Sequence, residues 1–158
     1  MKQPRGPTTW QKRWPMWLAG MLGALWTSPN TLIGLLLGVA GMPAGARLHW
    51  SRRDCALVFQ RWPWGPGGAL TLGMVILHTG QTLDVPCSTY EHQAGHSRHA
   101  PIRLGDHERA HIFQYMLLGP LFLPFYLLCG GISVRNPFER AADRYALHGR
   151  GWWPWSAG

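Results

Sequence analysis

The hydrophobic pattern begins with a polar, basic segment, residues 1–15, followed by a largely apolar stretch over residues 16–42 that is interrupted by Thr-Ser-Pro-Asn at 27–30. About 20 apolar residues cross a bilayer, so the whole stretch is long enough, while each half, at roughly 11 to 13 residues, is not. Three structures fit: a kinked transmembrane helix, a signal peptide with Met16–Trp26 as its apolar region, or a shallow hairpin in the membrane interface. We expect an uncleaved membrane anchor over residues 1–45.

Short β-prone runs follow at residues 47–50, 55–61 and 69–78, separated by Arg-Arg-Asp and by Trp-Gly-Pro-Gly-Gly. Turn residues between short apolar runs predict a short antiparallel β meander. Residues 84–104 contain Pro, Ser, Gly and three His without a hydrophobic period, which predicts a long loop. Loops of this length are uncommon in compact domains unless they serve a functional site.

Two helices are predicted in the C-terminal half. Asp106 is a suitable N-cap for a helix over residues 107–118. Asn136 and Pro137 have the residue types of the cap and first position of a last helix, which would end near Leu147. We therefore expect an α+β domain over residues 46–158.

Between these helices, residues 117–132 are apolar but contain Gly119, Pro120 and Pro124. Proline in a helix interior removes a hydrogen bond and breaks or kinks the helix. The segment is either a second membrane-embedded element or a buried part of the core.

Composition narrows the class of partner. The 158 residues suffice for one domain, and the formal charge is +8. The basic residues are scattered around apolar runs rather than gathered on one element, which favours membrane lipid over nucleic acid as the partner. The chain has ten Trp, a residue that favours membrane interfaces but also packs in cores. We expect no nucleic-acid partner.

The sequence His107-Glu108-Arg109-Ala110-His111 carries the clearest chemical signal. On a helix, residues four apart share one face, so both imidazoles can reach one metal ion, with Glu108 beside a metal-bound water as its base. Catalytic zinc takes three protein ligands and one open position, so a third ligand must come from elsewhere.

Glu139 is the best candidate for the third ligand, because it begins a separate helix and is followed one turn later by Asp143. The Asp143 carboxylate could accept a hydrogen bond from the free ring N–H of a metal-binding histidine. Two alternatives stay open. Three residues after Asn136, Glu139 could complete a capping interaction, and Asp143 could pair with an arginine on an exposed face. Because the chain has only seven acidic residues, we favour the metal-ligand role for Glu139.

These two motifs together resemble the gluzincin group of zincin metallopeptidases. Glu139-x-x-Ala142-Asp143, continued by Arg-Tyr-Ala, is similar to the second motif of membrane-bound gluzincins such as the type 1 CAAX prenyl proteases. From about Thr71 to Trp155 the chain also resembles small membrane-associated bacterial proteins.

The resemblance implies a zincin-like fold and a zinc-dependent peptidase of the bacterial cell membrane or envelope, acting on a peptide or protein. It implies Zn²⁺ held by His107, His111 and Glu139, with Glu108 as general base. The short spacing between the motifs leaves little room for a second, substrate-binding lobe. In zincins an edge strand aligns the substrate, and residues 72–77 are our candidate. An ordinary core strand fits these residues equally well.

The negatively charged intermediate needs a hydrogen-bond donor. The candidates from the sequence are Tyr115, Tyr145 and His148. Two other functions stay open: a non-catalytic envelope protein with a structural zinc site, and a basic, Trp-rich membrane-binding module.

Overall fold

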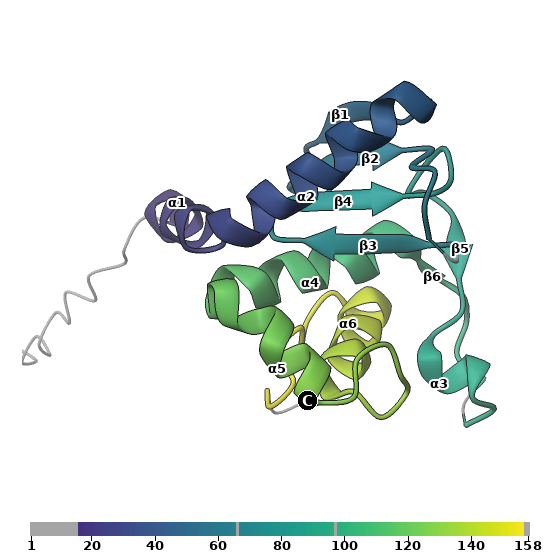
Figure 1. The fold of residues 1–158 in the computed structure, drawn as a ribbon. Coiled ribbons are helices and arrows are strands. Elements are labelled where there is room, and N and C mark those ends of the chain that lie inside the picture. The colour runs from purple at the N-terminus through teal and green to yellow at the C-terminus, as the bar shows by residue number, and fades with distance from the viewer. Residues whose placement is uncertain (1–15, 66, 97, 157–158) are drawn as a thin grey trace, which may run out of the picture.

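The computed structural model describes residues 16–65, 67–96 and 98–156. A four-stranded sheet lies between two helices, with α2 across one face and α4 across the other (Figure 1). A third helix, α6, packs on α4 on the side away from the sheet. The expected α+β class is confirmed. The helix bounds are Ser28–Gly41 (α2), Leu104–Leu118 (α4) and Pro137–His148 (α6).

The sheet has the strand order β1-β2-β4-β3. The pairs β1–β2 and β4–β3 are antiparallel, whereas β2 and β4 run parallel. The sheet is therefore mixed, and the prediction of an antiparallel meander is wrong. The strand bounds are Arg47–Ser51 (β1), Ala56–Gln60 (β2), Ala69–Leu72 (β3) and Val75–His78 (β4).

The error arises in residues 69–78, which form a hairpin instead of one strand. Gly73 adopts a φ of +62° at the turn, a conformation that glycine adopts at little cost. All four residues of β4 are buried, so this strand takes the interior position and leaves β3 at the edge. Our candidate substrate strand, residues 72–77, contains the turn and is not an edge strand. The edge strand that lies against α4 is β3.

Helix α2 packs closely on the sheet through a row of buried glycines. A Cβ atom on Gly34 would lie 2.8 Å from the Cβ of Val75, and one on Gly38 would overlap the ring of Phe59. The strands' side chains alternate between the two faces, so Phe59 and Val75 pack under α2 while Val58 packs on the α4 side. Helix α2 is thus a structural layer of the domain.

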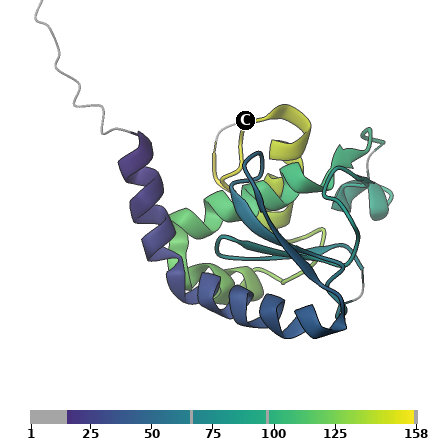
Figure 2. The same cartoon turned by 90° about the horizontal axis from the view of Figure 1, so that it is seen from above.

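Helix α1 (Met16–Trp26) precedes α2, and the two meet at a bend of 65° (Figure 2). Residues 1–15 of the expected anchor lie outside the described residues. The other apolar run, Leu104–Leu128, comprises α4, the 3₁₀ turn η2 (Gly119–Leu121) and α5 (Phe122–Leu128). Its 25 residues are long and apolar enough to cross a membrane, a property shared by core helices of soluble proteins.

Helix α4 begins at Leu104, three residues before the predicted start, and Asp106 lies in its first turn instead of capping it. The preceding residue, Arg103, explains the shift. Its guanidinium donates two hydrogen bonds, of 2.6 and 3.1 Å, to the buried carboxylate of Asp54 and one of 3.3 Å to Asp106. This ion-pair cluster holds the first turn of α4 beside the β1–β2 connection.

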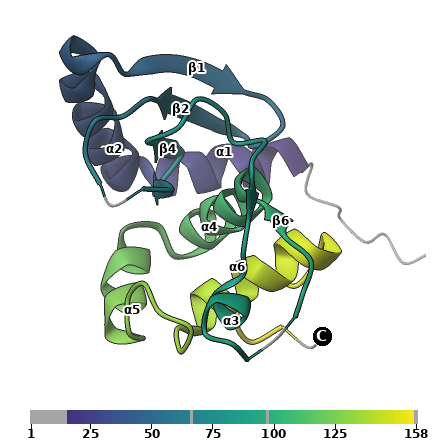
Figure 3. The ribbon, with the colours of Figure 1, turned by 90° about the vertical axis from the view of Figure 1, so that its right-hand side faces the viewer.

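The predicted long loop contains three short elements. β5 (Pro86–Cys87) pairs antiparallel with β6 (Ile102–Arg103), and α3 (Tyr90–Gln93) lies against α6 (Figure 3). Remaining turns include η1 (Met42–Ala44), which follows α2. The long loop therefore brings α3 to the same side of the domain as α4 and α6.

Candidate metal centre

Three buried side chains from α4 and α6 converge on one point. The Nε2 atoms of His107 and His111 lie 3.2 Å apart. The Oε2 atom of Glu139 lies 3.0 Å from Nε2 of His107 and 3.4 Å from Nε2 of His111. The three residues predicted as ligands are thus brought together, with one donor atom from each within 4.8 Å of the others.

The start of α6 directs Glu139 into this cluster. The side chain of Asn136 accepts a hydrogen bond from the backbone N–H of Phe138 (3.0 Å), as expected of a cap. Its amide also donates to backbone carbonyls of Tyr126 and Gly131. The carboxylate of Glu139 contacts the histidines and the Tyr126 hydroxyl, so the capping alternative does not describe its contacts.

Asp143 lies one turn further along α6 and supports His107 from behind. Its Oδ1 accepts a hydrogen bond of 2.9 Å from Nδ1 of His107, and its Oδ2 accepts one of 2.7 Å from the backbone N–H of Tyr90. A proton held on Nδ1 leaves the Nε2 lone pair free to bind a metal. The position of Asp143 therefore matches the supporting role expected from the sequence.

Gln114 gives His111 the same support from within α4. Its Nε2 donates to the backbone carbonyls of Phe138 (3.1 Å) and Trp152 (2.8 Å), which sets the orientation of the amide. Its Oε1 therefore faces Nδ1 of His111, at 2.8 Å, and accepts that proton. Both imidazoles consequently present Nε2 to the centre.

The charges at the centre also suit a cation. Burial disfavours the charged form of His107, but hydrogen bonds from its ring to Asp143 and Glu139 outweigh burial and raise its pKa to about 10. Burial alone would raise the pKa of Glu139, but His111 and His107 hold that pKa well below its usual range. Glu139 thus favours a proton on Nε2 of the imidazoles, and a divalent cation at the centre would replace a proton at Nε2 while the Nδ1 protons stay in place.

Two imidazole nitrogens and one carboxylate oxygen form a donor set that fits a divalent metal such as zinc. The outer nitrogens are held by acceptors, as in metal sites of known chemistry. Nitrogen and oxygen donors also accept other divalent ions, so this geometry is compatible with zinc without selecting it.

Glu108 is buried beside the three predicted ligands, and its carboxylate is hydrogen-bonded to the edge strand β3. Its Oε2 accepts a hydrogen bond of 2.6 Å from the hydroxyl of Thr71 on β3. This bond ties α4 to the edge strand and leaves Oε1 of Glu108 without a protein partner among the described hydrogen bonds. Nothing in the sequence pattern singled out Thr71, because the contact depends on how β3 is placed.

Two cavities meet at Glu108 and His107. The larger, of about 410 Å³, extends towards Trp64 and Cys87. The smaller, of about 210 Å³, extends past the metal centre towards α5. Both are lined by Leu70 of β3, so together they follow the edge strand past the candidate base.

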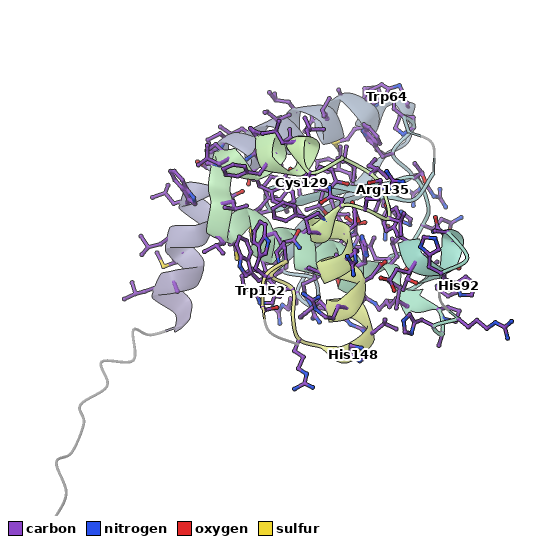
Figure 4. The ribbon with its side chains drawn as sticks, turned by 90° about the horizontal axis from the view of Figure 1, so that it is seen from below. Trp64, His92, Cys129, Arg135, His148 and Trp152 are labelled. Atoms are coloured by element: carbon purple, nitrogen blue, oxygen red, sulfur yellow. The ribbon has the colours of Figure 1, made fainter. Side chains whose placement is uncertain are left out.

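The structure separates the three candidate donors. Tyr115 lines the smaller cavity, whereas Tyr145 packs under Phe113 and the Arg109 guanidinium, and His148 lines a separate pocket. Figure 4 labels His148 at the edge opposite α2.

Two other phenols lie at the centre that the sequence did not identify. Tyr90 lines both cavities, and the Tyr126 hydroxyl donates to Glu139. Both come from segments without a motif, the long loop and the Pro-containing apolar run, so no sequence signal could have found them.

Comparisons with protein-family models, curated proteins and solved structures found no match.

Proposed function

We propose that this chain is a membrane-associated, zinc-dependent hydrolase of peptidase type. The observation that supports the proposal is the convergence of His107, His111 and Glu139 next to a buried Glu108 that faces two cavities. A structural zinc site is closed by its protein ligands, whereas a catalytic site keeps a position open. Three protein donors with open space beside them correspond to the catalytic type.

Zn²⁺ held by these residues would supply Lewis acidity, polarising a carbonyl oxygen and making water a nucleophile at neutral pH. Glu108 would serve as the proton acceptor for an attacking water through Oε1, since Oε2 accepts the Thr71 hydroxyl. The same carboxyl group can then return the proton to the departing amine. Thr71 keeps the carboxylate of Glu108 in one orientation during both transfers.

The substrate would lie along β3. This strand pairs with β4 on one side only, and its residues Ala69, Leu70 and Thr71 line the cavities. An extended peptide can bind such an edge through backbone hydrogen bonds, which would place its carbonyl groups next to Glu108. Tyr90, Tyr115 and Tyr126 line the smaller cavity, and they are our candidates for the donor to a developing oxyanion.

The test compares Glu108→Gln with the wild type for zinc content and peptide hydrolysis. The variant should keep stoichiometric zinc and lose hydrolysis, because the amide cannot accept the proton. Partly exposed Glu91 provides a matched control, and Glu91→Gln should retain both properties. Unchanged hydrolysis in Glu108→Gln would refute the assigned base. Zinc without turnover on a broad peptide library would favour a structural site, and wild-type protein without zinc would refute the metal centre.

A further inference from the structure

Large apolar side chains are exposed on α1, α2 and α5. Figures 2 and 3 show α2 and α5 on one side of the molecule, with α1 continuing from α2 at the corner. Leu36 of α2 is 72% exposed, and Leu128 of α5 is 82% exposed. We call this surface the apolar face. Its exposed members are Met21, Leu22, Leu25, Leu32, Ile33, Leu36, Val39, Leu121, Phe125, Leu127, Leu128 and Ile132.

The apolar face is formed by two segments that contain no Asp, Glu, Lys or Arg, residues 16–46 and 110–134. They are far apart in the sequence but joined in the fold, where the buried Asn30 amide of α2 donates to the carbonyl of Gly119 (3.0 Å). A soluble monomer rarely exposes an apolar surface of this extent, so the face has an occupant.

The residues at the borders of the face indicate lipid as that occupant. Trp26 and Trp64, each about half exposed, lie near the two ends of α2, as tryptophans do at membrane–water interfaces. Each charge-free segment is followed directly by an arginine, Arg47 and Arg135, and the chain carries a net charge of +8. Basic residues beside an apolar surface match the anionic headgroups of a bilayer.

The length of α2 determines how the bilayer is contacted. Its 14 residues measure about 21 Å at 1.5 Å per residue, shorter than a hydrocarbon core of about 30 Å. Gly34 and Gly38 also hold its other side against the sheet. On a bilayer, helix α2 would therefore lie along the interface with one side among the acyl chains, which corresponds to the interfacial alternative for this segment.

The smaller cavity opens on this same face. Among its lining residues are Leu127 and Ile132, which are 62% and 71% exposed and belong to the apolar face. Leu70 of the edge strand lines the same cavity. A peptide that reaches β3 from this side passes apolar side chains before it meets Glu108.

We propose that the apolar face docks on a lipid bilayer and that the site opens at the membrane surface, so that its substrates are apolar peptide segments from the bilayer. Docking on the bilayer does not depend on enzymatic activity, whereas the substrate class rests on the proposed peptidase function.

The docking part is tested by floating the full chain with vesicles of phosphatidylcholine and phosphatidylglycerol. The wild type should float with the vesicles. The double variant Leu36→Glu/Leu128→Glu should partition into the vesicles at least about tenfold less. Ala100→Glu, at an exposed position between α3 and β6, is the control and should float normally. Unchanged urea unfolding midpoints would show that the variants fold. A wild type that stays in water, a double variant that floats unchanged, or a stable dimer that ignores vesicles would overturn docking.

Whether the smaller cavity opens towards the bilayer is tested by an experiment that does not require hydrolysis. A spin label at Leu127→Cys or Ile132→Cys, with the native cysteines replaced by serine, reports contact with lipid-soluble oxygen or with a water-soluble nickel chelate. On vesicles, both labels should gain oxygen contact and lose nickel contact, while a label at Ala100→Cys should not change. Labels that stay exposed to the chelate on vesicles would overturn the proposed opening.

The substrate class is tested with one cleavable sequence, presented either in a vesicle-inserted peptide or in a soluble one. The zinc-loaded protein should cleave the inserted peptide at least about tenfold faster at equal total concentration, because binding to the same surface raises the local concentration. Equal rates would overturn the substrate class and leave the peptidase function standing. If the zinc-loaded protein cleaves neither peptide, the substrate class and the peptidase function are both refuted. Docking is decided separately, by flotation and labelling.

Discussion

Asp143 provides a quantitative test of the candidate metal centre, because it would act on a bound metal only through His107. Its two oxygens accept from two donors, Nδ1–H of His107 at 2.9 Å and the backbone N–H of Tyr90 at 2.7 Å. In Asp143→Asn, the side chain keeps its shape but offers one acceptor oxygen and one NH₂ group. One of the two donors must then face the NH₂ group, whichever way the amide turns.

The expected size of the effect follows from these contacts. Loss of the group that orients a metal-binding histidine lowers metal affinity about 10- to 100-fold, which corresponds to about 1.4–2.7 kcal/mol. A hydrogen bond to a charged group contributes about 1.5–3 kcal/mol, so losing one bond of Asp143 accounts for the whole effect. Asp143→Ala removes both bonds and should weaken zinc binding at least as much.

The assay is competition for zinc between the protein and a fluorescent chelator. Urea unfolding of the metal-free variants measures the separate loss of stability from the Tyr90 contact. Glu91→Gln is the matched control, because it removes a nearby negative charge at a partly exposed site without touching a predicted ligand. An unchanged zinc Kd in both Asp143 variants would refute the positioning role and the ligand role of His107 with it.

Three further predictions address the metal centre and the packing. Tyr126→Phe removes the hydroxyl that donates to the predicted carboxylate ligand, and should raise the zinc Kd about tenfold; an equal Kd would contradict this. Metal-free protein should lose stability as pH rises from about 6.5 to about 10, because the raised pKa of His107 stabilises the fold only while the imidazole is protonated. A urea midpoint that is flat over this range would contradict that ion pairing. Gly38→Ala places a methyl group in the ring of Phe59 and should cost about 1–3 kcal/mol in urea unfolding; a neutral effect would show that α2 is not closely packed.

Local chemistry explains what could be predicted from the sequence. Two histidines four residues apart on a helix share a face regardless of the rest of the fold. Asn136 caps α6 through a contact within two residues, and Gly149 ends that helix in the left-handed conformation. Because both helices were predictable, the group His107, His111 and Glu139 could be inferred before any tertiary contact was known.

The strand arrangement could not be predicted, because pairing joins residues distant in the chain. The burial of all of β4 and the turn at Gly73 divide residues 69–78 into two strands. That division places β3 at the edge and Thr71 next to Glu108. Hydrophobic periodicity does not distinguish a buried strand beside a turn from a longer strand.

The helices that carry the candidate ligands and the two charge-free apolar segments can thus be recognised in the amino-acid sequence. The fold is needed to bring Tyr90, Tyr126 and Thr71 to the candidate metal centre and to join the two apolar segments beside the smaller cavity. The difference lies in the range of the interactions. Caps and helical spacing are set within a few residues, whereas cavities and surfaces arise from contacts such as that of Asn30 with Gly119, 89 residues away.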